Sequence, residues 1–132
     1  TLPELLAVIV ILAIVTTIAT MGIQGVLKSI HEKTLETKEK MIEEGSILYG
    51  QDNRVLLVNT CTVDSVTYTT CLTKTVQELL DNNYLKSDEL CEKEDGSTFN
   101  CYKNDVTGES MNTKSINIYL KNNQVYAKII KN

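Results

Sequence analysis

Residues 1–27 read TLPELLAVIVILAIVTTIATMGIQGVL, and this stretch decides the fold. No charged residue occurs from Leu5 to Leu27, a run longer than the about 20 apolar residues that a helix needs to cross a bilayer. The one charge in the stretch, Glu4, stands at the start of that run. Pro3 falls in the first turn, where a helix tolerates proline. The stretch therefore predicts a hydrophobic helix that can sit in a membrane.

A helical pattern continues beyond Lys28, where the sequence becomes polar and charged. Apolar or small residues recur there every three or four positions, as on one face of an amphipathic helix. We expect this stripe to be buried against the chain's own sheet, and the helix to run from about Leu2 to Tyr49. We expect His31 to be exposed. The stripe consists of Val26, Leu27, Ile30, Thr34, Met41, Gly45 and Leu48.

The remaining residues, 54–132, carry the signals of a small antiparallel sheet. Asn122-Asn123 separates the segments Ser115–Lys121 and Gln124–Lys131, and asparagine tolerates the positive φ that a tight hairpin needs. Further extended segments are predicted at 54–59, 63–70 and 98–102, and a short helix at 74–82. The predicted fold is α+β: a long N-terminal helix, hydrophobic over 1–27 and amphipathic over 28–53, packed against a small antiparallel sheet in a head formed by 54–132.

Four cysteines, Cys61, Cys71, Cys91 and Cys101, all lie in the polar part of the chain. None forms a CxxC pair, and the single histidine is distant in sequence, so disulfides are favoured over a zinc site. Disulfides imply an oxidising compartment outside the cytoplasm. Four cysteines allow three pairings. The short gaps and the turn signal Asp95-Gly96 favour Cys61–Cys71 with Cys91–Cys101, and the other patterns remain open.

Composition and motifs argue against several classes of function. The net charge is −4 with no cluster of lysine or arginine, and one phenylalanine and no tryptophan leave little material for base stacking. Nucleic acid is therefore not expected as the main partner, although a weak contact stays open. No catalytic or nucleotide-binding motif occurs, so we expect neither an enzyme nor a cofactor. Asp95, Ser97 and Asp105 form a minor candidate for calcium, without EF-hand spacing.

Residues 1–12, TLPELLAVIVIL, resemble the N-terminus of type IV pilins and the related pseudopilins. The resemblance is specific over residues 1–15, and Val76–Lys86 resembles a short helix and turn in the heads of some members. It implies maturation by a prepilin peptidase, and we expect an N-methylated phenylalanine to precede Thr1. The chain departs from the family at Pro3 and in lacking the helix-kinking proline. Gly22 and Gly25 stand near that place, which predicts local melting of the helix in a filament.

The resemblance implies that Glu4 neutralises the N-terminal amine of an adjacent subunit. Because each charge alone is costly in an apolar bundle, the pair would fix the stagger between subunits. The alternative is that Glu4 is an exposed first-turn residue favoured by the helix dipole. The implied core of the filament consists of Leu2, Leu5, Leu6, Val8, Ile9, Leu12, Ile14 and Val15.

The expected function is therefore that of a major pilin, a subunit that polymerises into an extracellular type IV pilus. Before assembly the chain would be anchored in the cytoplasmic membrane, and its partners would be its own copies, the prepilin peptidase and the pilus assembly machinery. Two alternatives remain. One is a pseudopilin of a type II secretion or DNA-uptake system, and the other is a membrane-anchored module whose head binds a ligand. Adhesion, motility and DNA uptake all use the same kind of polymer.

Overall fold

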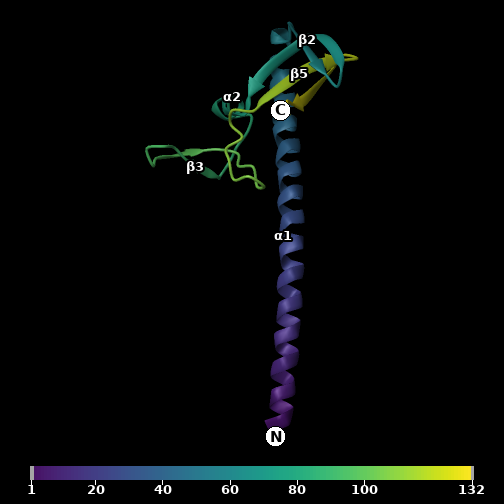
Figure 1. The fold of residues 1–132 in the computed structure, drawn as a ribbon. Coiled ribbons are helices and arrows are strands. Elements are labelled where there is room, and N and C mark those ends of the chain that lie inside the picture. The colour runs from purple at the N-terminus through teal and green to yellow at the C-terminus, as the bar shows by residue number, and fades with distance from the viewer. Residues whose placement is uncertain (1, 132) are drawn as a thin grey trace.

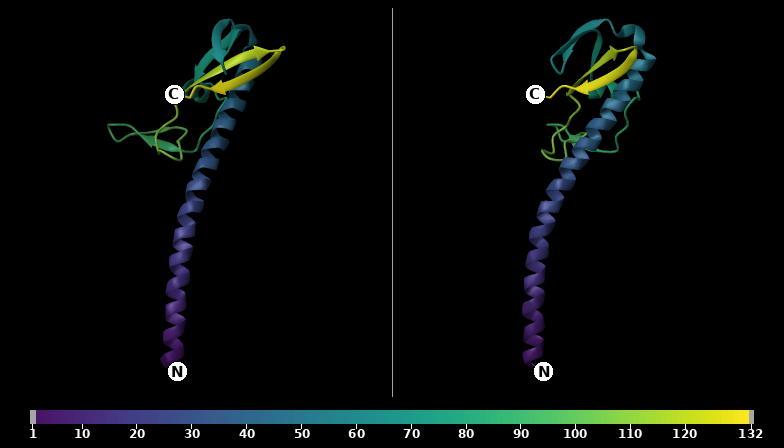
Figure 2. Two further views of the ribbon diagram at one scale, coloured as in Figure 1. Left: turned by 45° about the vertical axis from the view of Figure 1, so that its right-hand side comes forward. Right: turned by 90° about the vertical axis from the view of Figure 1, so that its right-hand side faces the viewer.

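The computed structural model describes the backbone of residues 2–131 and the side chains of residues 2–14 and 26–131. One long helix ends in a small head (Figure 1). The helix, α1, spans Leu2–Asp52, and its 51 residues extend about 76 Å at 1.5 Å per residue. The head packs on one side of the C-terminal part of α1, and the helix curves gently away from it (Figure 2). The chain is thus α+β, as the sequence predicts.

The head contains a four-stranded antiparallel sheet and a separate two-stranded one. The larger sheet has the order β1-β2-β5-β6, and the smaller pairs β3 with β4. Asn122 and Asn123, with φ of 52° and 66°, join β5 to β6 and confirm the predicted hairpin. The elements after α1 are η1 (Arg54–Leu56), β1 (Asn59–Val63), β2 (Val66–Thr75), α2 (Val76–Asp81), β3 (Leu90–Glu92), β4 (Thr98–Asn100), β5 (Ser115–Lys121) and β6 (Gln124–Ile129).

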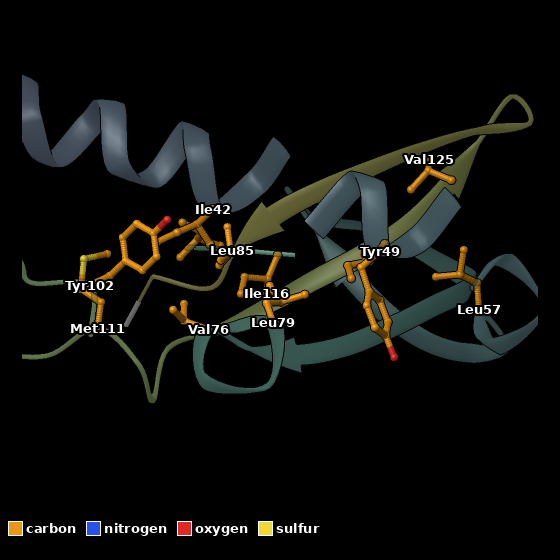
Figure 3. Packing of buried hydrophobic residues seen from close by; sticks show 12 residues of the cluster. Ile42, Tyr49, Leu57, Val76, Leu79, Leu85, Tyr102, Met111, Ile116 and Val125 are labelled. Carbon is orange, nitrogen blue, oxygen red and sulfur yellow. The ribbon is translucent and has the colours of Figure 1, made fainter. Parts of the chain in front are cut away.

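The core forms where one face of α1 lies on the sheet and on α2 (Figure 3). Ile42 and Tyr49 of α1 are buried there against Ile116 and Ile118 of β5 and Leu79 of α2. This face also carries Gly45, Ser46 and Gly50, all buried. Gly50 lets α1 approach the sheet closely, because a Cβ there would meet Ile118 Cγ2 at 2.6 Å. Gly45 lets α1 approach the segment after α2, because a Cβ there would lie 2.8 Å from the Tyr84 backbone oxygen.

The predicted buried stripe on the second half of the helix is wrong, apart from Gly45. Met41 is 48% exposed, whereas the next residue, Ile42, is completely buried. The buried face carries large apolar residues only at every seventh position, Leu35, Ile42 and Tyr49, with polar or small residues between them, so a spacing of three or four does not select it. The sheet covers the face that carries the small residues. Exposed members of the predicted stripe are Val26, Leu27, Ile30, Thr34, Met41 and Leu48.

Several shorter predictions also need correction. Residues 54–59 do not form one extended segment, because 54–56 form the 3-10 turn η1. The predicted strand at 63–70 is interrupted by a turn at Asp64 and Ser65, whose φ values of 49° and 68° separate β1 from β2. Strands β1 and β3 were not predicted in their observed positions. The short helix is confirmed as α2, which Thr75 caps by accepting a hydrogen bond from the Glu78 amide. The predicted strand at 98–102 is confirmed in part as β4.

Two disulfides, Cys61–Cys71 and Cys91–Cys101, brace the head and confirm the favoured pairing. The first joins β1 to β2 within the larger sheet. The second joins β3 to the residue that follows β4, and so closes the smaller sheet on itself. Each bridge stabilises the head by lowering the conformational entropy of the unfolded chain. This matters because the head has only a small core of its own.

Candidate functional site

The first half of α1 is the outstanding surface of the molecule. All residues from 2 to 14 are helical and exposed, and Leu2 is 81% exposed. Large apolar side chains point outward in every direction around this segment, since they occupy nearly every position. Soluble monomers rarely expose apolar patches larger than a few hundred Å², so such a surface marks an interaction site. These side chains are Leu2, Leu5, Leu6, Val8, Ile9, Val10, Ile11, Leu12 and Ile14.

The predicted filament-core residues occupy this surface. Leu2, Leu5, Leu6, Val8, Ile9, Leu12 and Ile14 are all exposed on α1, and none is covered by the head. The side chain of Val15 lies outside the described residues. The surroundings of Gly22 and Gly25 also lie outside them, although the backbone there is helical. Melting of this stretch in a filament therefore stays a prediction.

Glu4 lies in the first turn of α1 and is exposed among the apolar side chains. An acidic residue is favoured at this end of a helix, because the first-turn amides give it a partial positive charge. It is the one charged residue between Leu2 and Leu27. A partner that surrounds this end of α1 would remove the carboxylate from water, which is costly unless the partner supplies a positive charge.

Exposed apolar residues continue along α1 toward the head. Val26, Leu27 and Ile30 are all about half exposed, as is Met41 further along. At the underside of the head, Leu27 and His31 line a mainly apolar notch with Val106, from the loop that follows β4. Among the described side chains of α1, exposed apolar residues therefore occur both in the first turns and beside the head.

A partly buried ion-pair cluster connects the loop after β4 to α1. Lys38 Nζ donates to Glu89 Oε1 at 2.5 Å, to Asp105 Oδ1 at 3.0 Å and to the Lys103 carbonyl at 3.1 Å. Glu89 Oε2 in turn accepts a hydrogen bond from the Lys103 amide. This cluster was not predicted from the sequence, because its members are 51 and 67 positions apart.

The cluster shifts the pKa of both partners toward the charged form. Burial disfavours the Glu89 carboxylate, but the hydrogen bond from the Lys103 amide and the pairing with Lys38 outweigh it, so the pKa of Glu89 is lowered. Burial likewise disfavours the ammonium of Lys38, but its hydrogen bonds to Glu89 and Asp105 raise the pKa of Lys38. Lys38 and Glu89 are therefore both favoured in their charged forms.

The residues considered for calcium binding, Asp95, Ser97 and Asp105, do not come together in the structure. Asp95 Oδ1 accepts hydrogen bonds from the amide and hydroxyl of Ser97 in the turn between β3 and β4. Asp105 pairs with Lys38 instead, so the minor calcium candidate does not form one site. Among the described side chains, no group of three or more histidine, cysteine or acidic residues could hold a metal ion. All four cysteines are in disulfides, so none is a thiol nucleophile.

Comparison with known proteins found no matching family model, no matching curated protein and no matching solved structure. Within the residues that the structure describes, no helix is both long enough and apolar enough to span a membrane.

Proposed function

We propose that this chain is a pilin, a structural subunit that polymerises through its N-terminal helix into an extracellular filament of the type IV pilus kind. The observation that carries the proposal is the exposed apolar surface of residues 2–14 on a helix that projects far from its head. Such a surface is unfavourable in water, at about 25 cal/mol per Å² of apolar area. In a bundle of copies it is covered by identical surfaces.

The shape of the subunit supports polymerisation over binding of a small ligand. The head lies at one end of α1, so parallel helices can bundle with their heads arranged around them (Figure 2). Glu4 would then pair with the N-terminal amine of a neighbour and set the stagger, since both charges would be desolvated in the bundle. The resemblance of residues 1–12 to type IV pilins points to the same arrangement.

Before assembly, the uncharged run from Leu5 to Leu27 would hold the subunit in the cytoplasmic membrane. The prepilin peptidase and the pilus assembly machinery would act on it there, and the mature filament would lie at the cell surface. A pseudopilin of a secretion or DNA-uptake system uses the same helix, so it remains the second candidate. Long surface fibres built from this chain support the pilus, and short fibres confined to the envelope support the pseudopilus.

The Glu4→Ala variant tests the assembly role of the carboxylate. We expect this variant to reach the membrane fraction at the wild-type level while the yield of sheared fibres, measured by electron microscopy and immunoblotting, falls by about tenfold or more. Glu32→Ala is the matched control, because Glu32 is also an exposed carboxylate on α1 but lies beyond the apolar run. Normal fibre yield from Glu4→Ala would reject the pairing role, and absence of any fibre from wild type would reject the pilin.

A further inference from the structure

The β3–β4 hairpin projects sideways from the base of the head as a separate arm (Figure 1). Its strands pair only with each other within the two-stranded sheet, and the Cys91–Cys101 disulfide closes its base. The turn at its tip is ordered, because Asp95 accepts hydrogen bonds from Ser97 and Gly96 supplies the positive φ of 87°. The hairpin is therefore a pre-formed projection that loses little conformational entropy when it binds.

The tip of this hairpin is acidic. Glu92, Glu94 and Asp95 are exposed there, and Lys93 is the one basic residue between Leu90 and Asn100. Three carboxylates and one ammonium give this segment a charge of −2. The Lys93 ammonium lies 5.9 Å from the centre of the Phe99 ring, beside the hairpin's own strand.

Positive charge is carried by the last strand of the larger sheet, β6, and by the residues on either side of it. Segment 121–131 carries Lys121, Lys128 and Lys131 and no acidic residue, a charge of +3. Lys131 is 3.4 Å from Glu39 on α1, yet its side chain is 72% exposed. The lysines of this segment therefore offer positive charge to a partner.

A groove of about 470 Å³ lies between the C-terminal end of β6, with Lys128 and Lys131, and the tip of the β1–β2 hairpin. Its lining includes Lys128 and Lys131 on one side, Thr62 and Asp64 on the other, and Asn117 of β5. Asn117 and Lys128 are paired on the face of the sheet turned away from α1, so the groove opens on the outside of the head. Two lysines and one acidic residue, Asp64, line the groove, which leaves one net positive charge in the lining, and Lys131 also pairs with Glu39.

We propose that the acidic tip of the β3–β4 hairpin of one subunit docks into the lysine-lined groove of a second copy of this chain. The charges of the two surfaces are complementary, and both surfaces occur on every subunit. The hairpin projects to the side of α1 (Figure 1). The groove is lined by residues of the larger sheet and by none of the hairpin, so the contact joins different patches of two copies. Such a heterologous contact repeats along an open helical polymer.

This inference rests on the proposed function, because the tip is too small to hold two copies together alone. A stable interface buries about 1,200–2,000 Å² in total, and a five-residue turn supplies only a part of that. The bundled helices would provide most of the buried area. The hairpin contact would then set the rotation between neighbouring heads, as complementary charges commonly fix register more than they add affinity.

Zero-length cross-linking of native fibres tests the contact directly. A carbodiimide joins a carboxylate to a nearby lysine as an amide, with loss of one water. We expect peptides that link Glu94 or Asp95 to Lys128 or Lys131, and in fibres grown from mixed ¹⁵N and ¹⁴N subunits these links should join heavy and light chains. The Lys38–Glu89 pair, at 2.5 Å within one subunit, is the internal control. Fibres that give the control link but no hairpin–groove link overturn the inference alone.

A charge exchange tests the same contact independently. Glu94→Lys and Lys128→Glu should each lower the fraction of subunits that remain assembled after a salt wash, by about twofold to fivefold for an exposed pair. The double variant should restore that fraction toward the wild-type value. Lys86→Glu, an exposed lysine outside the tip and the groove, should leave it unchanged. Lack of recovery in the double variant overturns the contact, and absence of wild-type fibres overturns the proposed function and this inference with it.

Discussion

The ammonium nitrogen of Lys38 on α1 lies 2.5 Å from Oε1 of Glu89, 51 positions further along the chain. Only 13% of the Lys38 side chain is exposed, so this pair is largely withdrawn from water. The segment that carries Glu89 leads directly into β3, and Asp105, beyond β4, binds the same ammonium. One lysine on the long helix therefore holds both ends of the projecting hairpin.

Lys38→Met should destabilise the head, because it leaves two carboxylates close together without their cation. Loss of one partner of a buried pair costs about 3–5 kcal/mol, and partial exposure of Glu89 reduces our expectation to about 2 kcal/mol. Thermal unfolding of the full chain in detergent micelles measures this loss. Lys40→Met is the matched control, since Lys40 is exposed two positions away on the same helix. Equal effects of the two variants would show that Lys38 does not act as a clamp.

The stability that Glu89 contributes should depend on pH in a defined direction. Its pKa in the folded chain lies below the ordinary value of 4.5, so the charged form is favoured by folding. That contribution is complete above pH 4.5 and is lost as the pH falls through the lowered pKa. Wild type and Glu89→Gln should therefore differ by a constant free energy of unfolding near neutral pH, with the difference shrinking below pH 4.5. A difference that grows on acidification would contradict the assignment.

Two neighbouring residues of α1, Met41 and Ile42, should contribute very differently to the stability of the folded chain. Ile42 is fully buried, so Ile42→Ala should cost about 3 kcal/mol of unfolding free energy. Met41 is half exposed on the other face, so Met41→Ala should change the stability of the monomer by less than about 0.5 kcal/mol. Denaturant titration in micelles compares them. Similar losses from the two variants would mean that the head does not cover the face described.

The long helix and the hairpin at Asn122-Asn123 could be predicted from sequence because their signals are local. An uncharged run and a pair of residues that tolerate positive φ act over a few positions. Disulfides were predictable from the number and spacing of the cysteines, but the pairing was one of three that the sequence left open. The short gaps and the turn signal at Asp95-Gly96 favoured the pairing Cys61–Cys71 with Cys91–Cys101, which the structure has.

The buried face of α1 could not be predicted, because its large apolar residues, Leu35, Ile42 and Tyr49, recur only every seven positions. The exposed stripe fits a spacing of three or four better. What distinguishes the buried face is its small residues, Gly45, Ser46 and Gly50. Gly50 permits close approach of the sheet, and Gly45 permits close approach of the segment after α2. The turn at Asp64 and Ser65, which separates β1 from β2, was missed because it contains no glycine or asparagine, the residues that most readily adopt positive φ. The Lys38 cluster depends on tertiary proximity alone, so no local pattern contains it.

Gly45→Ala should be destabilising even though alanine is the better helix former. A Cβ at this position would lie 2.8 Å from the backbone oxygen of Tyr84 and 2.5 Å from Leu85 Cδ2. Helix propensity favours alanine by about 1 kcal/mol, whereas overpacking costs about 1–3 kcal/mol, and a backbone oxygen has little room to move. We expect a net loss of about 1 kcal/mol by thermal unfolding. Glu44→Ala, at the neighbouring exposed position, should be nearly neutral, and a more stable Gly45→Ala would show that the contact relaxes freely.

Removal of the two disulfides should have different local consequences. Each bridge spans a sequence separation of 10, for which the chain-entropy estimate is about 2–3 kcal/mol. Cys61 and Cys71 lie on strands that the four-stranded sheet also holds, whereas β3 and β4 pair only with each other. An isolated two-stranded sheet is marginal in water, so the hairpin should open locally without its bridge.

Limited proteolysis of the full chain with trypsin resolves this difference at Lys93, which lies in the exposed turn between β3 and β4. Cleavage after Lys93 should accelerate by about tenfold or more in Cys91→Ser/Cys101→Ser, because local unfolding of the hairpin gives an extended backbone that can enter the active site of the protease. The matched variant Cys61→Ser/Cys71→Ser should leave the rate at Lys93 close to that of wild type. Equal acceleration in both variants would mean that the hairpin opens only when the whole head unfolds, so the arm would not be an independent unit.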